Sequence, residues 1–231
     1  MFIKDWWDIW IYLGAFLFVT MRPQTSSLIK GFFFKRKAKK TLEDKKILDF
    51  IFNKTGLKLK KITVIEDDRL LGMMGGGLVK PFMILTTLAV ELLNKGEMQW
   101  LLLHEAGHNR LHHSLKIALV LFLIFIPGSL FVGIYNNLYL SIFMDIFFGA
   151  AFGALANQFT RNFEYSANKY ALKRMDNPKD AITAAQKIIE RYKQKGLEDT
   201  FYRKLFSVWI LEIYRDLIKD ANKELERRKN K

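Results

Sequence analysis

Two long apolar runs separated by a short polar turn constrain this chain more than any other feature of its sequence. The first run, Ile117–Tyr135, contains no charged residue and is about as long as the roughly 20 residues that cross a bilayer core. Asn136 and Asn137 follow, and the second run, Leu138–Phe159, contains small residues that suit close helix packing. The sequence therefore predicts a transmembrane helical hairpin over 115–159.

A shorter apolar stretch, Trp6–Met21, precedes the hairpin and begins with tryptophans typical of a membrane interface. We expect residues 1–22 to form either a transmembrane span or a helix that lies in the interface. The basic residues that follow are expected to stay in the cytoplasm by the positive-inside rule; they are Lys35, Arg36, Lys37, Lys39 and Lys40. Because the hairpin would cross the membrane twice and return the chain to the face that it left, the polar segments 23–114 and 160–231 are both expected on the cytoplasmic side.

Composition agrees with a membrane protein that has a sizeable polar part. The 231 residues are 50% hydrophobic and 26% charged, with a formal net charge of +14. This positive charge gathers beside apolar segments and no nucleic-acid-binding motif accompanies it, so we expect a lipid bilayer as partner and no nucleic acid. The chain has no cysteine, which excludes disulfides, thiolate metal ligands and cysteine nucleophiles.

The five residues HEAGH, from His104 to His108, form a pattern that predicts a zinc site. Two histidines four positions apart project from one face of a helix and can bind one metal ion. Glu105 lies beside that face, where its carboxylate can act as general base toward the attacking water. We therefore expect one Zn²⁺ per chain, with His104 and His108 as ligands and Glu105 as the catalytic residue.

A catalytic zinc site needs a third protein ligand. A histidine six positions after the pattern would complete one class of site, but that position is Ser114. His112 and His113 stand on the wrong part of the turn to complete the site, and we expect both at the membrane interface, with contact to the substrate or the metal as the alternative. Asp145, inside the second apolar run, is a further alternative because an intramembrane acid is a functional candidate by default.

Glu164 is the ligand that the predicted topology favours. It lies in the segment TRNFEYSANKYAL, directly after the hairpin. Two membrane crossings return the chain to the face that it left, so Glu164 is expected on the same face as His104 and His108. The hairpin would then occupy the long interval between the two halves of the site.

The polar segments predict a helical domain with a small sheet. We expect a helix over Thr41–Lys54, in which Thr41 and Asp44 form a capping pair and Gly56 is the stop signal. The further expected elements are strands Lys58–Glu66 and Phe82–Thr86 with a flexible GMMGGG stretch between them, a helix over Glu97–His113, and helices from about Pro178 and Glu198. Met83–Thr86 could be an edge strand that pairs with an extended peptide or an interior strand.

HEAGH, an apolar hairpin and then TRNFEYSANKYA together resemble the HtpX-like membrane zinc metalloendopeptidases, relatives of the CAAX prenyl protease. The resemblance covers roughly Ile62–Leu172 and includes the upstream segment PFMILTTLAVELLNKGEMQWLLLHEAGH. It implies a mostly α membrane protein with a gluzincin-like zinc metalloprotease domain, a small β element and an inserted transmembrane hairpin. It also implies His104, His108 and Glu164 as zinc ligands and Glu105 as general base.

Two further site residues follow from the second motif. The family pattern after the ligand glutamate is ExxAD, and this chain has Asn168 at its last position. The resemblance implies that residue 168 orients a zinc-bound histidine, and an amide oxygen can accept that hydrogen bond without adding charge. Arg161 is predicted either to contact the substrate or transition state or to face lipid phosphates.

The function that the sequence predicts is a membrane-anchored, zinc-dependent endopeptidase. The resemblance implies that it hydrolyses membrane or misfolded proteins, and the predicted topology places this activity at the cytoplasmic face of an integral protein of the cell membrane. The alternatives are a zinc-binding but inactive membrane adaptor or chaperone, and an intramembrane protease that uses Asp145. The expected division of the chain is a membrane or interfacial segment (1–22), the two protease segments (23–114 and 160–231) and the hairpin between them (115–159).

Overall fold

The computed structural model describes residues 38–66, 72–75, 81–116, 119–120, 155, 158–194 and 201–230. The expected segment 1–22 and most of the expected hairpin, Asp145 included, lie outside these residues. Among the residues that the structure describes, no helix combines the length and the apolar character that a membrane crossing requires.

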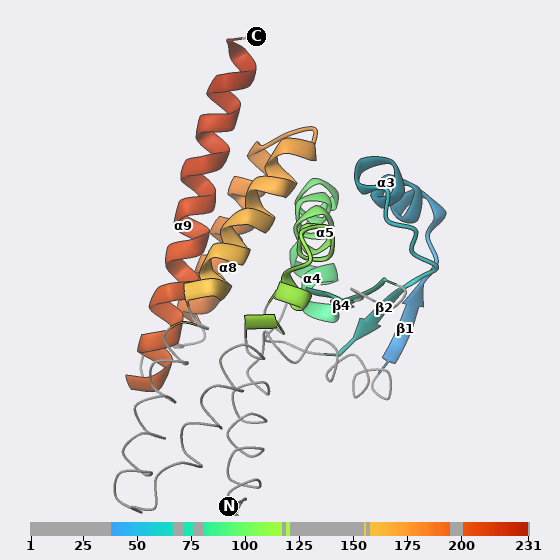
Figure 1. Cartoon of the computed structure of the whole chain (residues 1–231), viewed down its shortest axis with the longest axis horizontal. Coiled ribbons are helices and arrows are strands. Elements are labelled where there is room, and N and C mark those ends of the chain that lie inside the picture. Colours follow the sequence, from blue (N-terminus) through green and yellow to red (C-terminus); the bar gives the residue numbers. More distant parts are fainter. Residues whose placement is uncertain are drawn as a thin grey trace, which may run out of the picture.

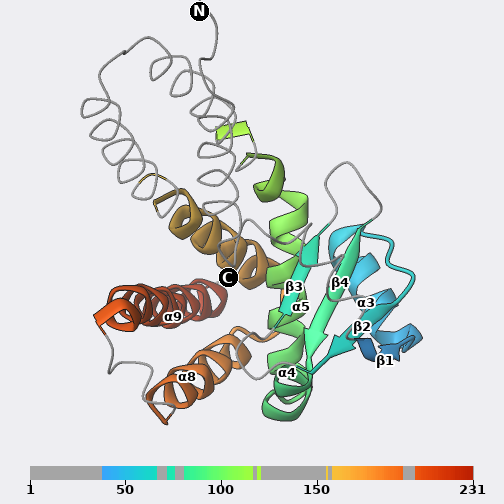
Figure 2. The same ribbon diagram turned by 90° about the horizontal axis from the view of Figure 1, so that it is seen from below.

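A four-stranded sheet forms one side of the domain (Figure 2). Its strands are β1 (Ala38–Leu42), β2 (Ile62–Ile65), β3 (Gly72–Gly75) and β4 (Phe82–Thr86), in the order β1-β2-β4-β3. The β2 segment, Ile-Thr-Val-Ile, is rich in β-branched residues, which fit a pleated surface. It pairs in parallel with β4, whereas β1 and β3 pair antiparallel with their neighbours.

The sheet corrects one expectation, settles a second and adds a strand that was not predicted. The Gly-rich stretch expected to be flexible contains β3, and Met73 pairs with Ile84 of β4. Within the described sheet β4 is therefore interior, and β3 holds the edge beside it. β1 was not expected, since its sequence AKKTL lacks an apolar alternation. In both β1 and β3, pairing with a neighbouring strand outweighs a weak local preference.

Helix α3 (Lys45–Thr55) begins and ends with identifiable caps. The Asp44 side chain accepts a hydrogen bond from the Lys46 amide at 2.8 Å, and Gly56 ends the helix with a φ of 70°, which favours glycine. The expectation that Thr41 shares the cap is wrong. Thr41 belongs to β1 and pairs with Thr63, so the helix starts four residues later than expected.

Helix α4 (Thr87–Leu92) follows β4 directly and leads into α5 (Lys95–Arg110). A capping box starts α5, in which the Asn94 and Glu97 side chains each accept a hydrogen bond from the other residue's backbone amide. The expected helix through His113 is interrupted. Helix α5 stops at Arg110, and His112 adopts a φ of 54°, which is uncommon for a residue other than glycine.

Residues 158–174, α8 (Lys179–Gln194) and α9 (Phe201–Lys229) form the helical side of the domain. Helices α8 and α9 start close to the expected positions. In both views α5 lies between these two helices and the sheet (Figure 1). The domain is therefore mostly helical with a small sheet, as the sequence predicted.

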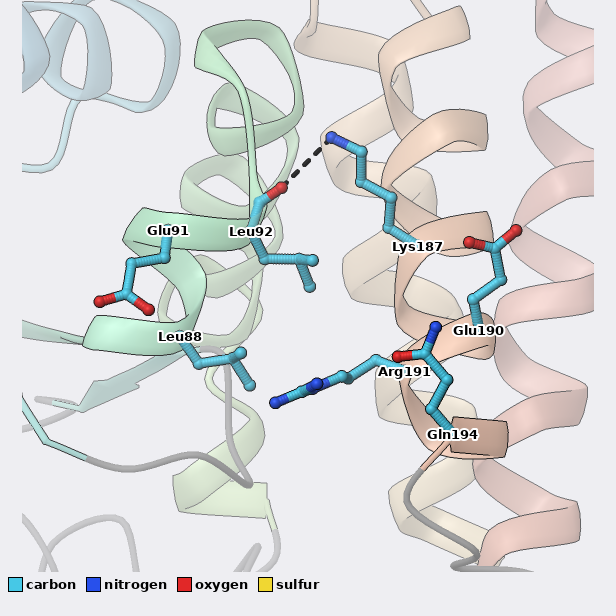
Figure 3. A pocket seen from close by; sticks show the side chains of 7 residues that line it. All are labelled: Leu88, Glu91, Leu92, Lys187, Glu190, Arg191 and Gln194. Carbon is cyan, nitrogen blue, oxygen red and sulfur yellow. Dashed lines mark hydrogen bonds between the residues drawn. The ribbon is translucent and has the colours of Figure 1, made fainter.

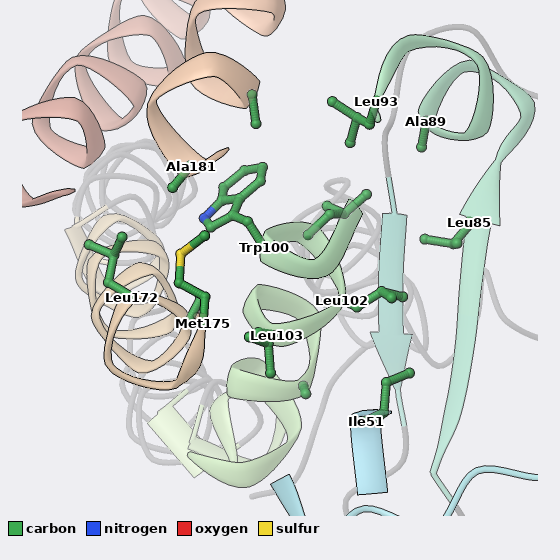
Figure 4. Close-up of a cluster of buried hydrophobic side chains, with 14 of the residues drawn as sticks. Ile51, Leu85, Ala89, Leu93, Trp100, Leu102, Leu103, Leu172, Met175 and Ala181 are labelled. Atoms are coloured by element: carbon green, nitrogen blue, oxygen red, sulfur yellow. The ribbon is translucent and has the colours of Figure 1, made fainter. Parts of the chain in front are cut away.

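The hydrophobic core surrounds α5 (Figure 4). Trp100 is 1% exposed and packs among side chains from several elements, and Leu102 and Leu103 are equally buried. Leu172 and Met175, from and just after the 158–174 helix, belong to the same cluster. Because α5 is enclosed in this way, the residues of HEAGH are held by the core itself.

Candidate metal centre

Two imidazoles on the last turns of α5 start the candidate site. His104 is buried and His108 half-buried, and their Nε2 atoms lie 3.1 Å apart. The two rings meet at an interplanar angle of 76° with centroids 4.8 Å apart. This arrangement follows from the i, i+4 spacing on one helical face.

The 158–174 helix brings Glu164 to the same point. Its Oε2 lies 3.3 Å from Nε2 of His104, and its Oε1 lies 3.5 Å from Nε2 of His108. One ligand atom from each of the three residues fits within 4.8 Å of the others. Zinc binds nitrogen and oxygen at about 2.1 Å in a tetrahedron, which separates neighbouring donors by about 3.4 Å. The donor types and their spacing therefore fit a zinc ion.

A glycine lets the two helices that carry these ligands approach closely. A Cβ atom added to Gly107 would lie 3.2 Å from Cα of Ala167 and 3.3 Å from its carbonyl oxygen. These neighbours are backbone atoms that cannot rotate away. Gly107, inside HEAGH, therefore sits where the 158–174 helix packs against α5, beside the donors.

Asn168, one turn after Glu164, contacts the first histidine. Its Oδ1 lies 2.8 Å from Nδ1 of His104. Since an amide oxygen only accepts hydrogen bonds, Nδ1 of His104 carries the proton, and Nε2 keeps a lone pair for a metal. Asn168 is buried, and its Nδ2 has no hydrogen-bond partner among the described residues.

His113 differs from its expected position at the membrane interface. It is 3% exposed, its Nδ1 lies 2.9 Å from Nδ1 of His108, and its Nε2 lies 3.0 Å from Oγ of Ser166. Its ring stacks on Phe163 at 4.4 Å. The sequence argument failed because it assumed a continuous helix, whereas the chain turns at His112. His112 itself is exposed.

The electrostatics of the cluster couple the acids to the histidines. Burial disfavours a charged imidazole, but the Glu164 carboxylate and then that of Glu105 outweigh it and raise the pKa of His108. Burial also opposes a charged Glu164, yet His108 and His104 hold its pKa well below the usual range. Burial, with the neighbouring charges of His108 and Lys116, lowers the pKa of His113 to about 3.

Glu105 and Tyr214 border the donor cluster. Glu105 is buried, and its carboxylate is close enough to shift the pKa of His108. The pKa of the Tyr214 phenol lies well above its ordinary value, because of burial first and then the charges of Tyr192, Glu164 and Glu105. Tyr214, on α9, also meets Trp100 edge-on at 6.4 Å. It was not predicted, since an aromatic residue on an amphipathic helix carries no functional signal.

Arg161 contacts α9 and a tyrosine of its own helix. Its guanidinium lies 2.9 Å from Oε1 of Glu212 and donates to the hydroxyl of Tyr165, which in turn donates to Asp216. The Arg161 side chain is 31% exposed. It therefore stands one turn before Glu164 but is already engaged by an acid.

A pocket of about 280 Å³ opens elsewhere, between α4 and α8 (Figure 3). Lys187 extends across its rim to the carbonyl oxygen of Leu92. None of the residues that line this pocket belongs to the donor cluster. The donor cluster, and not this pocket, is therefore the candidate site.

A helix with two histidines, a second helix with a glutamate and a sheet beside them define the class of a metallopeptidase domain. The model of peptidase family M48 matches residues 39–222, and the chain belongs to that family as an HtpX- and Ste24-like member. The crystal structure of Ste24p from S. mikatae is similar in fold, with a TM-score of 0.53 and 21% sequence identity. That match covers 83% of this chain and 52% of Ste24p, so the chain spans about half the length of that protein. No curated protein matches the chain.

Proposed function

We propose that this chain is a membrane-anchored zinc endopeptidase that hydrolyses peptide bonds of membrane or misfolded proteins at the cytoplasmic face. The observation that carries the proposal is the donor geometry. The two imidazole Nε2 atoms lie 3.1 Å apart, at 3.3 Å and 3.5 Å from different oxygens of the Glu164 carboxylate, close to the spacing of ligands around one zinc ion. We assign His104, His108 and Glu164 as the ligands.

A bound zinc ion would supply the Lewis acid that polarises the scissile carbonyl and activates water. The protein supplies proton transfer: the Glu105 carboxylate takes a proton from the attacking water and passes it to the leaving amine. Asn168 holds His104 with Nε2 facing His108 and Glu164, where this nitrogen would be available to a metal ion. Arg161 is a candidate substrate contact, for which it would exchange its ion pair with Glu212.

The edge strand β3 offers a place for the substrate backbone. In the described sheet β3 is the outermost strand on the side of α5 (Figure 2). An extended peptide that adds to this edge would form main-chain hydrogen bonds and so bind with little dependence on sequence. This mode of binding suits an enzyme that degrades misfolded chains.

Cleavage by the purified full chain tests the proposal. The chain, in detergent, is incubated with casein, with zinc or after chelation, and Glu105→Gln and Glu91→Gln are measured in parallel. Glu91 is exposed on α4 and serves as the matched control. We expect zinc-dependent cleavage that Glu105→Gln abolishes without loss of bound zinc and that Glu91→Gln retains. Cleavage that survives Glu105→Gln would contradict the mechanism.

The amide at Asn168 favours a second candidate, an inactive zinc-binding adaptor. A neutral residue at this position adds no charge to the histidine that it orients, and its Nδ2 lacks a partner among the described residues. This candidate predicts one zinc per chain and no cleavage of casein or membrane substrates. The same assay therefore separates the two functions.

Membrane sidedness has its own test. With the proposed topology, a tag after Lys231 is accessible only from the cytoplasm, and a tag between Asn136 and Asn137 only from outside. Labelling of intact and opened cells distinguishes the two positions. If both tags are labelled from one side, the proposed hairpin is wrong, although the donor cluster is unaffected.

A further inference from the structure

The turn at His112 brings His113 to the donor cluster. In an uninterrupted helix, residues five positions apart point about 140° away from one another, so His113 would face away from His108. The left-handed conformation of His112, with a φ of 54°, breaks that geometry. Beyond the turn residues 113–116 are again helical, and the His113 ring lies edge-on to that of His108 at 5.0 Å.

The hydrogen-bonding atoms around His113 have one consistent order of donors and acceptors. The Ser166 hydroxyl donates to the carbonyl oxygen of Phe163 at 3.0 Å, so its oxygen accepts from Nε2 of His113. With its proton on Nε2, neutral His113 has a lone pair on Nδ1. That lone pair lies 2.9 Å from Nδ1 of His108 and accepts its proton. The Nε2 atom of His108 is then unprotonated, and it faces the other two donors.

We propose that His113 is a positioning residue that, together with Ser166, fixes the tautomer and orientation of the metal ligand His108. This inference rests on the proposed zinc site. It goes beyond that site because it assigns each ligand histidine its own support. Asn168 holds His104 by one hydrogen bond. The hydrogen bonds from Ser166 through His113 hold His108.

Packing alone does not account for this arrangement. The stacking of His113 on Phe163 requires only an aromatic ring, which phenylalanine would supply equally. The imidazole, buried to 3% exposure, instead has a polar partner at each nitrogen. A buried polar group is costly unless it is paired. Here both hydrogen bonds of His113 belong to the series of donors and acceptors that leaves Nε2 of His108 unprotonated.

His113→Phe removes the acceptor and keeps the aromatic ring against Phe163. Ser166→Ala removes the hydroxyl that accepts the hydrogen bond from Nε2 of His113, and Ser166→Thr retains a hydroxyl at this position. The matched control is His112→Asn, which removes the exposed neighbouring imidazole, because asparagine tolerates the left-handed conformation. Zinc affinity of each purified full-length variant is measured by competition with a chromophoric chelator, and circular dichroism without zinc checks folding.

We expect His113→Phe to weaken zinc binding about 10- to 100-fold, as changes to partners of metal ligands typically do, with the stoichiometry at saturation unchanged. Ser166→Ala should give a smaller loss, which Ser166→Thr restores. In the His113→Phe background Ser166→Ala should have no further effect, because serine acts through His113. His112→Asn should bind zinc as the unaltered chain does.

Zinc affinity that is unchanged in folded His113→Phe overturns this inference and leaves the zinc site intact. Equal losses from Ser166→Ala with and without His113 would also overturn it, because the serine would then act independently. If the unaltered chain binds no zinc, or binds it without His108, the proposed function fails together with the inference.

Discussion

At the scale of single residues, the site is defined by where each imidazole carries its proton. His104 has its Nδ1 on an amide oxygen at 2.8 Å, and the Nδ1 of His108 lies 2.9 Å from a second imidazole. Both Nε2 atoms therefore converge on Glu164. Because the neighbours determine the tautomers, replacing a neighbour should change the zinc affinity, whereas replacing a ligand should lower the zinc content.

Glu164→Gln should lower the zinc content of the purified chain. A neutral amide is a poor zinc ligand, and the variant loses one of three donors. Metal analysis after dialysis against a zinc buffer measures the effect, and Glu212→Gln is a control because Glu212 contacts Arg161 and is not one of the donors. Full zinc occupancy in Glu164→Gln would place the third ligand elsewhere.

Asn168→Asp should raise zinc affinity and hydrolysis together. The carboxylate accepts the His104 Nδ1 proton more strongly, which makes the ring a better donor, and it removes the unpartnered buried Nδ2. We expect an increase of roughly 10-fold in affinity, measured by chelator competition, with casein cleavage assayed in parallel. An active native chain whose affinity and activity are both insensitive to Asn168→Asp would show that residue 168 does not tune the metal site.

The sequence predicted the residues of the donor cluster better than their surroundings. The HEAGH spacing and the position of Glu164 after the apolar hairpin singled out the three residues that the structure brings together, although their role as ligands stays a prediction. The contact of His113 with His108 was not predicted, because it depends on the left-handed conformation of His112, which no local pattern indicates. The engagement of Arg161 by Glu212 depends on α9, far along the chain, and could not be read locally.

At the scale of secondary-structure elements, the close packing of two helices controls the site. Gly107→Ala should weaken zinc binding, because the added methyl group would meet backbone atoms of Ala167 at 3.2–3.3 Å and push the 158–174 helix away from α5. Glu164 would then move with its helix. We expect a loss of at least several-fold in zinc affinity and a lower unfolding temperature. The control is Gly96→Ala at the start of α5, where the nearest atoms belong to the flexible Asp180 side chain.

Elements with strong local signals were predicted, and those fixed by distant pairing were not. β4 has the expected bounds, and α8 begins one residue after the expected start, since Pro178 marks it. β3 was taken for a flexible stretch because it is flanked by glycines, and β1 was missed because it carries lysines. Both strands are specified by the partner they pair with, which a local pattern does not contain.

At the scale of the whole molecule, one ion pair joins α5 to α8. Glu97 is 1% exposed, and its Oε2 lies 2.7 Å from Nζ of Lys187. Burial opposes the charge, yet the Lys187 and Asn94 hydrogen bonds outweigh it and lower the pKa of Glu97. A lowered pKa means that the stabilisation is present above the ordinary glutamate pKa and is lost as the pH falls through the folded value.

Glu97→Gln should therefore reduce the free energy of unfolding by about 1–2 kcal/mol at pH 7. The difference from the unaltered chain should shrink as the pH falls below the ordinary glutamate pKa of about 4.3 and disappear below the lowered pKa of folded Glu97, where the carboxyl is protonated in both states. Urea unfolding at both pH values measures this, with exposed Glu91→Gln as control. A difference that stays constant over this pH range would show that the charge of Glu97 does not contribute.

The two halves of the donor cluster are also separated in time. His104 and Asn168 stand 64 positions apart, and a ribosome makes the chain from its N-terminus, so HEAGH emerges well before the helix that carries Glu164. Until that helix has been made and has packed on Gly107, the nascent chain holds two histidines and an acid but no complete zinc site. The donor cluster is therefore complete only late in the synthesis of the chain, and the peptidase activity proposed for it would begin only at that stage.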